Sequence, residues 1–334
     1  MDKLVEETLA DGRWFPLRFK ADHYQFAFIP PERHRETAFL VHVQPAPNEI
    51  RVIPRSALAG MQPDRTDLHF ILHLGFGGST LLGKLLAEPR VAIALQEPPV
   101  LTDIVVHGPR NDAHQRAKLL DETRQLLSRP ITDSEALICK MTHVGNALAG
   151  PMAEAEPNSQ IVCLQTPMEE MLLSLALRGL GGRISARQIF MAIHDANMSV
   201  VQLTERDLAE HTDLHLGALA WLSMQKMMLD AAARLGPQRV RSIVTDQLMQ
   251  STGETLGAVA KHFRLDLDVD ERLAAGLMER HSKTGEPFDA RRRAERVAEG
   301  LRAHSAEIEP VVKWARKIAD KAGIAWELPH PLLS

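Results

Sequence analysis

The chain has 334 residues, a formal net charge of −4 and 45% hydrophobic residues. This length and apolar content suffice for one large domain with a substantial core, with or without appendages. The acidic balance and the lack of a basic block argue against a nucleic-acid partner. The first residues contain no signal-like apolar stretch and no apolar run approaches membrane-spanning length, so we expect a cytoplasmic protein without a membrane partner. Cys139 and Cys163 lie in apolar runs, which predicts buried thiols in a reducing compartment.

Residues 1–66 are predicted to form a small N-terminal α+β appendage, or cap. Apolar and polar residues alternate in part near residues 14–20, 24–29 and 50–53, as they do in half-buried strands. Pro30 and Pro31 predict the start of a short helix that ends near Phe39. We expect the aromatic residues of this cap to be core residues, and we place the main domain at residues 67–334.

The segment His69–Pro89 reads as a buried strand, a glycine turn and a helix that Pro89 closes. The turn and the helix start contain the residues expected to bind an anion: Gly75, Phe76, Gly77, Gly78, Ser79 and Thr80. Glycines let the backbone approach a phosphate, and the first N–H groups of a helix point at it. The alternative is an ordinary tight turn in which Ser79 caps the helix. From this element alone the two interpretations remain open.

The remaining chain alternates predicted strands and helices. Strands are expected at 91–95, 136–140, 160–164 and 240–244, and helices at 112–127, from Pro167 through Leu180, within 184–235, at 246–263 and within 290–322. This alternation predicts a three-layer α/β/α fold with a parallel sheet, right-handed crossovers and extra helices. The 184–235 region is expected to be a helical insertion that forms one wall of a substrate cavity.

A match to the nucleotide triphosphatase motif G-x-x-x-x-G-K-[ST] runs from Gly78 to Lys84. Leu85 occupies the position of the hydroxyl residue that would hold magnesium, and Leu81 and Leu82 fit a helix better than a phosphate loop. A P-loop kinase is therefore the least favoured alternative.

In the other register, Gly78–Leu82 resembles the 5′-phosphosulfate loop of P-loop sulfotransferases, which use 3′-phosphoadenylyl sulfate (PAPS) as donor. Phe76 stands where that family usually has Arg or Lys, and Gly77 where it has Ser. The resemblance implies that the loop binds the donor but lacks one usual cation. Lys84 and Lys140 are candidates to replace it.

Further segments resemble this family in the same order along the chain. The stretch Leu164–Ser174 resembles the segment that binds the 3′-phosphate, with Gln165 in place of an Arg and Ser174 as the helix hydroxyl. Arg178, one helical turn beyond Ser174, is expected to supply the missing charge. A match over 240–268 is mainly structural, and His281 and Lys283 fall where the family places a basic loop over the nucleotide. The chain looks most similar to bacterial sulfotransferase-like proteins of unknown substrate.

The resemblance implies transfer of a sulfuryl group from PAPS to a hydroxyl or amine of a small-molecule acceptor. Glu97, at a strand end on the ligand edge, is the candidate base, with His42, His73 and His143 as alternatives. No set of residues has metal-ligand spacing, so no metal is expected. The alternative function is a nucleotide-binding or scaffold protein that kept the fold and lost transfer activity, because Phe76 and Gln165 are both uncharged.

Overall fold

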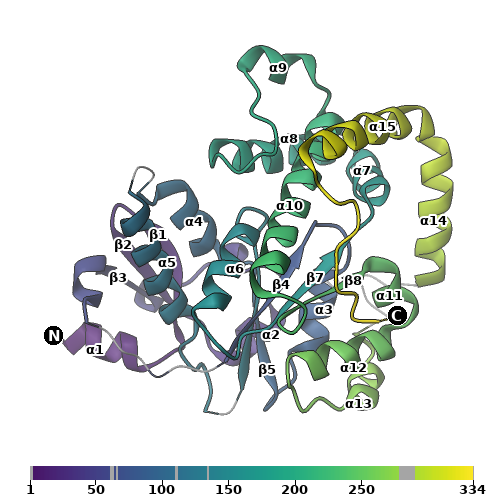
Figure 1. The fold of residues 1–334 in the computed structure, drawn as a ribbon. Helices are drawn as coiled ribbons and strands as arrows, with labels where there is room; N and C mark the ends of the chain where they lie inside the picture. Colours follow the sequence, from purple (N-terminus) through teal and green to yellow (C-terminus); the bar gives the residue numbers. More distant parts are fainter. Residues whose placement is uncertain are drawn as a thin grey trace.

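A computed structural model describes residues 3–60, 64, 67–109, 112–133, 135–277 and 290–333. The main sheet has five parallel strands in the order β5-β6-β4-β7-β8 (Figure 1). The strands are β4 (Leu68–His73), β5 (Ala92–Gln96), β6 (Ala136–Lys140), β7 (Ile161–Gln165) and β8 (Val240–Val244). The predicted parallel sheet is confirmed, and β6 and β8 have the predicted bounds.

Helices cover both faces of this sheet, so the predicted three-layer α/β/α fold is also confirmed. Alternate strand residues point to opposite faces, which places Ile71 in one apolar cluster and Phe70 and Leu72 in the other. The Ile71 face is covered by α3 (Ser79–Leu86), α11 (Thr245–Gln250), α12 (Thr252–His262) and α13 (Val269–Ala274). The other face is covered by α4 (Pro99–His107), α5 (Ala113–Leu127), α6 (Asn146–Glu154) and α10 (Asp213–Leu235).

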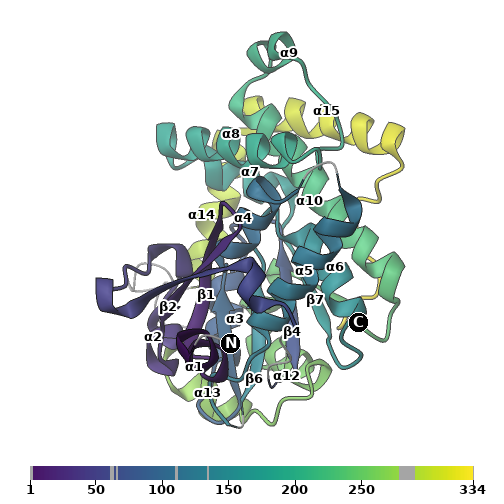
Figure 2. The same ribbon diagram turned by 90° about the vertical axis from the view of Figure 1, so that its left-hand side faces the viewer.

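The N-terminal residues form an antiparallel sheet of three strands beside α4 and α5 (Figure 2). Its elements are α1 (Lys3–Ala10), β1 (Trp14–Lys20), β2 (His23–Phe28), α2 (Pro31–Glu36), η1 (Leu40–His42), η2 (Pro47–Glu49), β3 (Ile50–Pro54) and η3 (Arg55–Leu58). Phe15, Tyr24 and Phe26 are buried in the same apolar cluster as one face of the main sheet. Four aromatic residues of the cap, Phe15, Phe19, Tyr24 and Phe26, are therefore core residues, as predicted, whereas Trp14, Phe28 and Phe39 are only partly buried.

A group of helices lies at the top of Figures 1 and 2: α7 (Met168–Ala176), α8 (Gly179–Asp195), α9 (Glu205–Glu210) and α15 (Ser305–Ala322). The helix α14 (Ala290–Ala303) runs down one side of the molecule (Figure 1). None of the helices in the described ranges is long and apolar enough to cross a bilayer. Both cysteines are buried free thiols, as predicted.

Several predicted helices end early or are broken. The helix expected through Leu180 ends at Ala176, because Gly179 takes a left-handed backbone with φ 58° and α8 then starts in a new direction. A Cβ at Gly182 would lie 2.0 Å from the Leu175 carbonyl oxygen, so the glycine allows this close contact.

Two further predicted helices are divided at single residues with non-helical backbone, and others are shorter than predicted or interrupted by a longer segment. The 246–263 helix is divided at Ser251, and the tail helix is divided at His304. The helix expected to close at Pro89 ends at Leu86, and the one expected to reach Phe39 ends at Glu36. The 184–235 region contains an interruption at residues 196–204.

Residues near the C-terminus extend the main sheet beside β8, which the sequence did not predict. Ser242 forms a parallel bridge with Pro331. The Ser242 N–H donates to the His330 carbonyl at 2.9 Å, and the Leu332 N–H donates to the Ser242 carbonyl at 2.8 Å.

Candidate functional site

The turn between β4 and α3 has an unusual backbone. Gly75, Phe76 and Gly78 all have positive φ, at 85°, 59° and 90°. The helix α3 then begins at Ser79, so Leu81 and Leu82 are helical. They are therefore not part of a phosphate loop, which agrees with the rejection of the triphosphatase motif. Because a non-glycine residue at positive φ is strained, Phe76 needs surrounding contacts to hold it in this conformation.

Two threonines hold this loop against the ends of neighbouring strands. Thr166 follows β7 and donates from Oγ1 to the Gly75 carbonyl at 3.0 Å, and Thr245 follows β8 and donates to the Gly77 carbonyl at 3.3 Å. A Cβ at Gly77 would lie 1.9 Å from Thr166 Oγ1, so only glycine fits there. The sequence analysis did not identify either threonine. Each directly follows a predicted parallel strand, and this position would have indicated them.

The loop presents unused donors at the start of α3. In the described part of the chain, no acceptor takes the amide N–H groups of Gly77, Gly78 and Ser79. These groups lie at the positive end of a helix dipole, which favours an anion. The geometry therefore agrees with an anion-binding loop.

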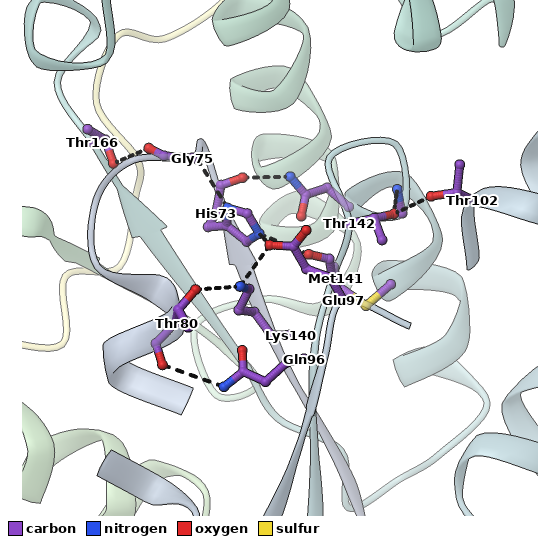
Figure 3. Close-up of polar contacts among 12 residues, drawn as sticks. His73, Gly75, Thr80, Gln96, Glu97, Thr102, Lys140, Met141, Thr142 and Thr166 are labelled. Carbon is purple, nitrogen blue, oxygen red and sulfur yellow. Dashed lines mark hydrogen bonds and ion pairs between the residues drawn. The ribbon is translucent and has the colours of Figure 1, made fainter. Parts of the chain in front are cut away.

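A buried lysine reaches the same helix start. Lys140, the last residue of β6, lies with Nζ 2.9 Å from Thr80 Oγ1 and 2.7 Å from Glu97 Oε1 (Figure 3). The Phe39 ring of the cap lies below the same ammonium group, with its centroid 4.7 Å away. Glu97 follows β5 with a positive φ of 52°. The structure thus brings two of the predicted catalytic residues, Glu97 and Lys140, together at the loop.

The charges of this pair are mutually stabilised. Burial raises the pKa of Glu97, but attraction to the Lys140 ammonium and the hydrogen bond from it outweigh that effect and lower the pKa from 4.5 to about 2. Burial lowers the pKa of Lys140, and Glu97 opposes this shift. The pair is therefore expected to be ionised at neutral pH, and a carboxylate held in this way is a weak base.

Two of the alternative bases lie beside Glu97. His73 is buried, with Nε2 2.9 Å from the Met141 carbonyl oxygen and 3.5 Å from Glu97 Oε1, and Nδ1 accepts from the Gly75 N–H at 3.1 Å (Figure 3). Burial lowers the pKa of His73 to about 3, so the ring is neutral. The ring of His143 is half-buried and lies 5.4 Å from that of His73. His42 is exposed in η1, where its ring packs on Phe39.

The side chain of Gln165 forms hydrogen bonds with a segment far along the chain, around Trp326. Its Nε2 donates to the Trp326 carbonyl at 2.7 Å and its Oε1 accepts from the Leu328 N–H at 3.4 Å. Ser174 is half-buried on α7, and no contact joins it to Gln165 in the described ranges. The sequence did not indicate that Gln165 would bind the C-terminal segment.

Arg178 lies beside the loop and not along one face with Ser174. The expected spacing on one helix is wrong, because α7 ends at Ala176 and Arg178 precedes α8. The Arg178 guanidinium instead stacks on the Phe76 ring, with Cζ 4.5 Å from the centroid. A cation therefore lies next to Phe76, the position at which the sulfotransferase loop that this sequence resembles usually has Arg or Lys.

Lys84 is half-buried further along α3, about 7.5 Å along the helix axis from Ser79. Burial lowers its pKa, and we find no contact from its ammonium to the loop within the described ranges. His281 and Lys283 lie outside the described residues. Within the described ranges, no group of three or more His, Cys, Asp or Glu side chains is arranged to hold a metal ion.

The comparisons with known proteins do not assign the chain to a family. No family model matches the chain, and no curated protein matches it. Among solved structures, the chain is similar to a sulfotransferase domain from the curacin biosynthetic pathway, with TM-score 0.44 and 14% identity over 80% of this chain and 100% of that domain. It is also similar to the sulfotransferase domain of the Synechococcus PCC 7002 olefin synthase, with TM-score 0.42 and 14% identity over 80% of this chain and 99% of that domain. Both TM-scores are low, so the description of the fold rests on the strand order and helices of this chain.

Proposed function

We propose that the protein is a sulfotransferase that moves the sulfuryl group of PAPS to a hydroxyl or amine of a small acceptor. The observation that carries this proposal is the start of α3, where within the described ranges the N–H groups of Gly77, Gly78 and Ser79 have no acceptor and Thr80 contacts the buried Lys140. The motif resemblance from Gly78 to Leu82 supports the choice of a 5′-phosphosulfate over other anions.

Sulfuryl transfer needs placement and charge stabilisation more than covalent chemistry from the protein, as phosphoryl transfer does. The sulfur–oxygen bond to the 5′-phosphate breaks as the acceptor oxygen or nitrogen bonds to sulfur. The proposed role of the loop N–H groups and of Lys140 is to stabilise the negative charge that the leaving phosphate gains. The acceptor's proton passes to a base.

Glu97 is the proposed base, and Lys140 controls its basicity. In the free protein the ion pair holds the pKa of Glu97 at about 2. A donor anion at the loop would compete for the Lys140 ammonium and would also repel the carboxylate. Both effects raise the pKa of Glu97, so the carboxylate becomes a stronger base when donor is bound.

The test is calorimetric titration with 3′-phosphoadenosine 5′-phosphate and, separately, with ATP and magnesium. Tight binding of the first nucleotide supports the proposal. Preference for ATP with magnesium, or failure to bind either, overturns it. In a P-loop kinase the Ser or Thr at the end of the motif binds magnesium. Here Leu85 has that position, and because α3 starts at Ser79 it lies inside the helix.

A nucleotide-binding protein without transfer activity is the second candidate. The observation that favours it is Gln165, whose amide is occupied by Trp326 and Leu328 and carries no charge for a 3′-phosphate. The discriminating measurement is release of 3′-phosphoadenosine 5′-phosphate from PAPS in the presence of simple phenols and amines. Nucleotide binding with no release over many hours favours this second candidate.

A further inference from the structure

A hollow in the N-terminal cap lies one side chain away from the candidate site. It has a volume of about 370 Å³ and is here called the cap cavity. Its wall is formed by Arg33 of α2 and by residues 37–39 and 42–44, which follow α2 along the chain. The volume is within the range of small-molecule sites. None of the segments that resemble sulfotransferases includes these residues, so the resemblance assigns them no role.

Phe39 belongs both to the wall of the cap cavity and to the candidate site. Its ring centroid lies 4.7 Å from Lys140 Nζ, and that nitrogen lies 2.7 Å from Glu97 Oε1 (Figure 3). The side chain of Lys140 is only 1% exposed, whereas that of Glu97 is 18% exposed. Two consecutive contacts therefore lead from the cavity wall to the proposed base, and a ligand can reach the base but not the lysine.

The strand order separates the cap cavity from the nucleotide side of the site. The edge strand β5 precedes Glu97, and α2 packs beside β5. Gln165, at the position that the resemblance gives to the 3′-phosphate, ends β7 on the other side of β4. A nucleotide that extends from the loop after β4 toward β7 leaves the β5 side of the loop to the acceptor.

The wall of the cap cavity is basic. Its titratable side chains are Arg33 and His42, and its described lining includes no Asp or Glu. The Arg33 guanidinium has five N–H donors, of which one faces Glu49 Oε2 at 3.4 Å and another donates to the Gln44 carbonyl at 3.0 Å. In the described part of the chain, the other guanidinium donors and the polar side-chain atoms of His42 and Gln44 have no hydrogen-bond partner. These groups can all donate to an anion.

We propose that the cap cavity binds a carboxylate of the acceptor, and that the acceptor is a small hydroxy acid whose hydroxyl reaches Glu97 across the Phe39 ring. This inference rests on the proposed function. A guanidinium binds a carboxylate through two parallel hydrogen bonds, and the aromatic ring offers an apolar surface to the body of the acceptor. The acceptor oxygen bonds to sulfur as the sulfur–oxygen bond to the 5′-phosphate breaks, and the hydroxyl proton passes to Glu97.

The binding test compares three phenols that differ only at the far end: 4-hydroxyphenylacetate, its neutral methyl ester and the cation tyramine. Each is titrated into the full chain by ligand-observed NMR, with and without 3′-phosphoadenosine 5′-phosphate. The carboxylate should bind about tenfold more tightly than the ester, because hydrogen bonds between charged groups are the strong ones, and tyramine should bind most weakly. Equal affinities, a preference for tyramine or no binding of 4-hydroxyphenylacetate overturns the proposal.

Variants of the cavity wall test whether Arg33 causes this preference. Arg33→Gln should remove the preference, and Arg33→Lys should keep part of it because the charge remains. Arg13→Gln removes the same charge from the cap at a position outside the cavity and is the matched control. Gln44→Glu, at an exposed position, adds a carboxylate to the wall and should shift the preference toward tyramine. Circular dichroism checks folding, and Gln44→Glu decides the question if Arg33→Gln does not fold. A folded variant of either kind with the wild-type preference overturns the proposal.

The transfer test uses PAPS and the same three phenols. The wild type should prefer 4-hydroxyphenylacetate in kcat/KM, and Arg33→Gln should lose this preference without a change in the affinity for 3′-phosphoadenosine 5′-phosphate. If the nucleotide binds and the preference for the carboxylate is absent, the cavity proposal fails alone. If the nucleotide does not bind, the proposed function fails and the acceptor role of the cavity fails with it.

Discussion

The ammonium nitrogen of Lys140 lies 2.7 Å from Glu97 Oε1, at the point where two neighbouring parallel strands end. The same nitrogen is 2.9 Å from Thr80 Oγ1 in the first turn of α3. One buried cation therefore connects the proposed base to the proposed anion-binding loop. This connection makes the stability of the fold and the chemistry of the site depend on the same residue.

Lys140→Met is expected to destabilise the protein by about 3–5 kcal/mol, because it leaves the largely buried Glu97 carboxylate without its cation. The double variant Lys140→Met/Glu97→Gln should recover much of this loss, since it removes both charges. Urea unfolding of the wild type, both single variants and the double variant measures the coupling. Additive losses in the double variant would show that the two charges are independent.

Gly77→Ala is expected to weaken binding of 3′-phosphoadenosine 5′-phosphate by at least about tenfold. The added Cβ would collide with Thr166 Oγ1 and move the loop N–H groups. The control is Gly181→Ala, where a Cβ meets no atom within 4 Å. If a folded Gly77→Ala variant and the control bind the nucleotide with equal affinity, the loop is not part of the nucleotide-binding site.

Glu97→Gln is expected to lower kcat by roughly 10²–10⁴-fold while nucleotide affinity changes little. Because bound donor raises the pKa of Glu97, the acid limb of the pH profile of kcat should lie well above the value of about 2 in the free protein. His143→Gln is measured in parallel. A large loss in His143→Gln together with near-normal turnover in Glu97→Gln would assign the proton transfer to the histidine.

Arg178→Ala is expected to weaken adenosine 5′-phosphate and 3′-phosphoadenosine 5′-phosphate by the same factor of several-fold. The reason is that the guanidinium lies over Phe76 in the loop and thus near the 5′ end. Arg206→Ala, on exposed α9, removes the same charge at a distance and serves as the control. Selective loss of affinity for the 3′-phosphorylated nucleotide would instead support the role expected from the sequence.

Acid is expected to destabilise the protein below about pH 6.5 through three buried histidines. Burial lowers the pKa of His34 to about 3, of His69 to about 4 and of His73 to about 3, each from 6.5. The unfolded chain therefore binds protons between these values that the folded chain does not, and stability falls as the pH is lowered.

His34 gives the cleanest test of this acid effect, since neither of its ring nitrogens has a hydrogen-bond partner among the described residues. His34→Leu should reduce the slope of unfolding free energy against pH by about 1.4 kcal/mol per unit between pH 5.5 and 4. His23→Leu, at an exposed position, is the matched control. Urea unfolding of the wild type and both variants across this pH range measures the slope of unfolding free energy against pH.

The parallel sheet and its layers could be predicted because buried strands appear in the sequence as short apolar runs such as Ala136–Lys140. The glycine turn after β4 was equally visible. Contacts between distant segments were not: nothing in the sequence pairs Thr245 with Gly77 or Gln165 with Trp326. The break at Arg178 was hidden because the apolar spacing continues across it, and that break is what moves Arg178 to Phe76.

The segment around Trp326–Leu332 has a consequence for how the protein is made. Gln165 and Ser242 receive hydrogen-bond partners from residues that are synthesised long after them. On the ribosome, β7 and β8 can form before their partners have left the exit tunnel. The edge of the sheet beside β8 then stays open until that segment emerges, which leaves unpaired backbone groups available to other nascent chains. A fusion placed directly after Leu332 therefore acts on the pairing of this edge of the sheet.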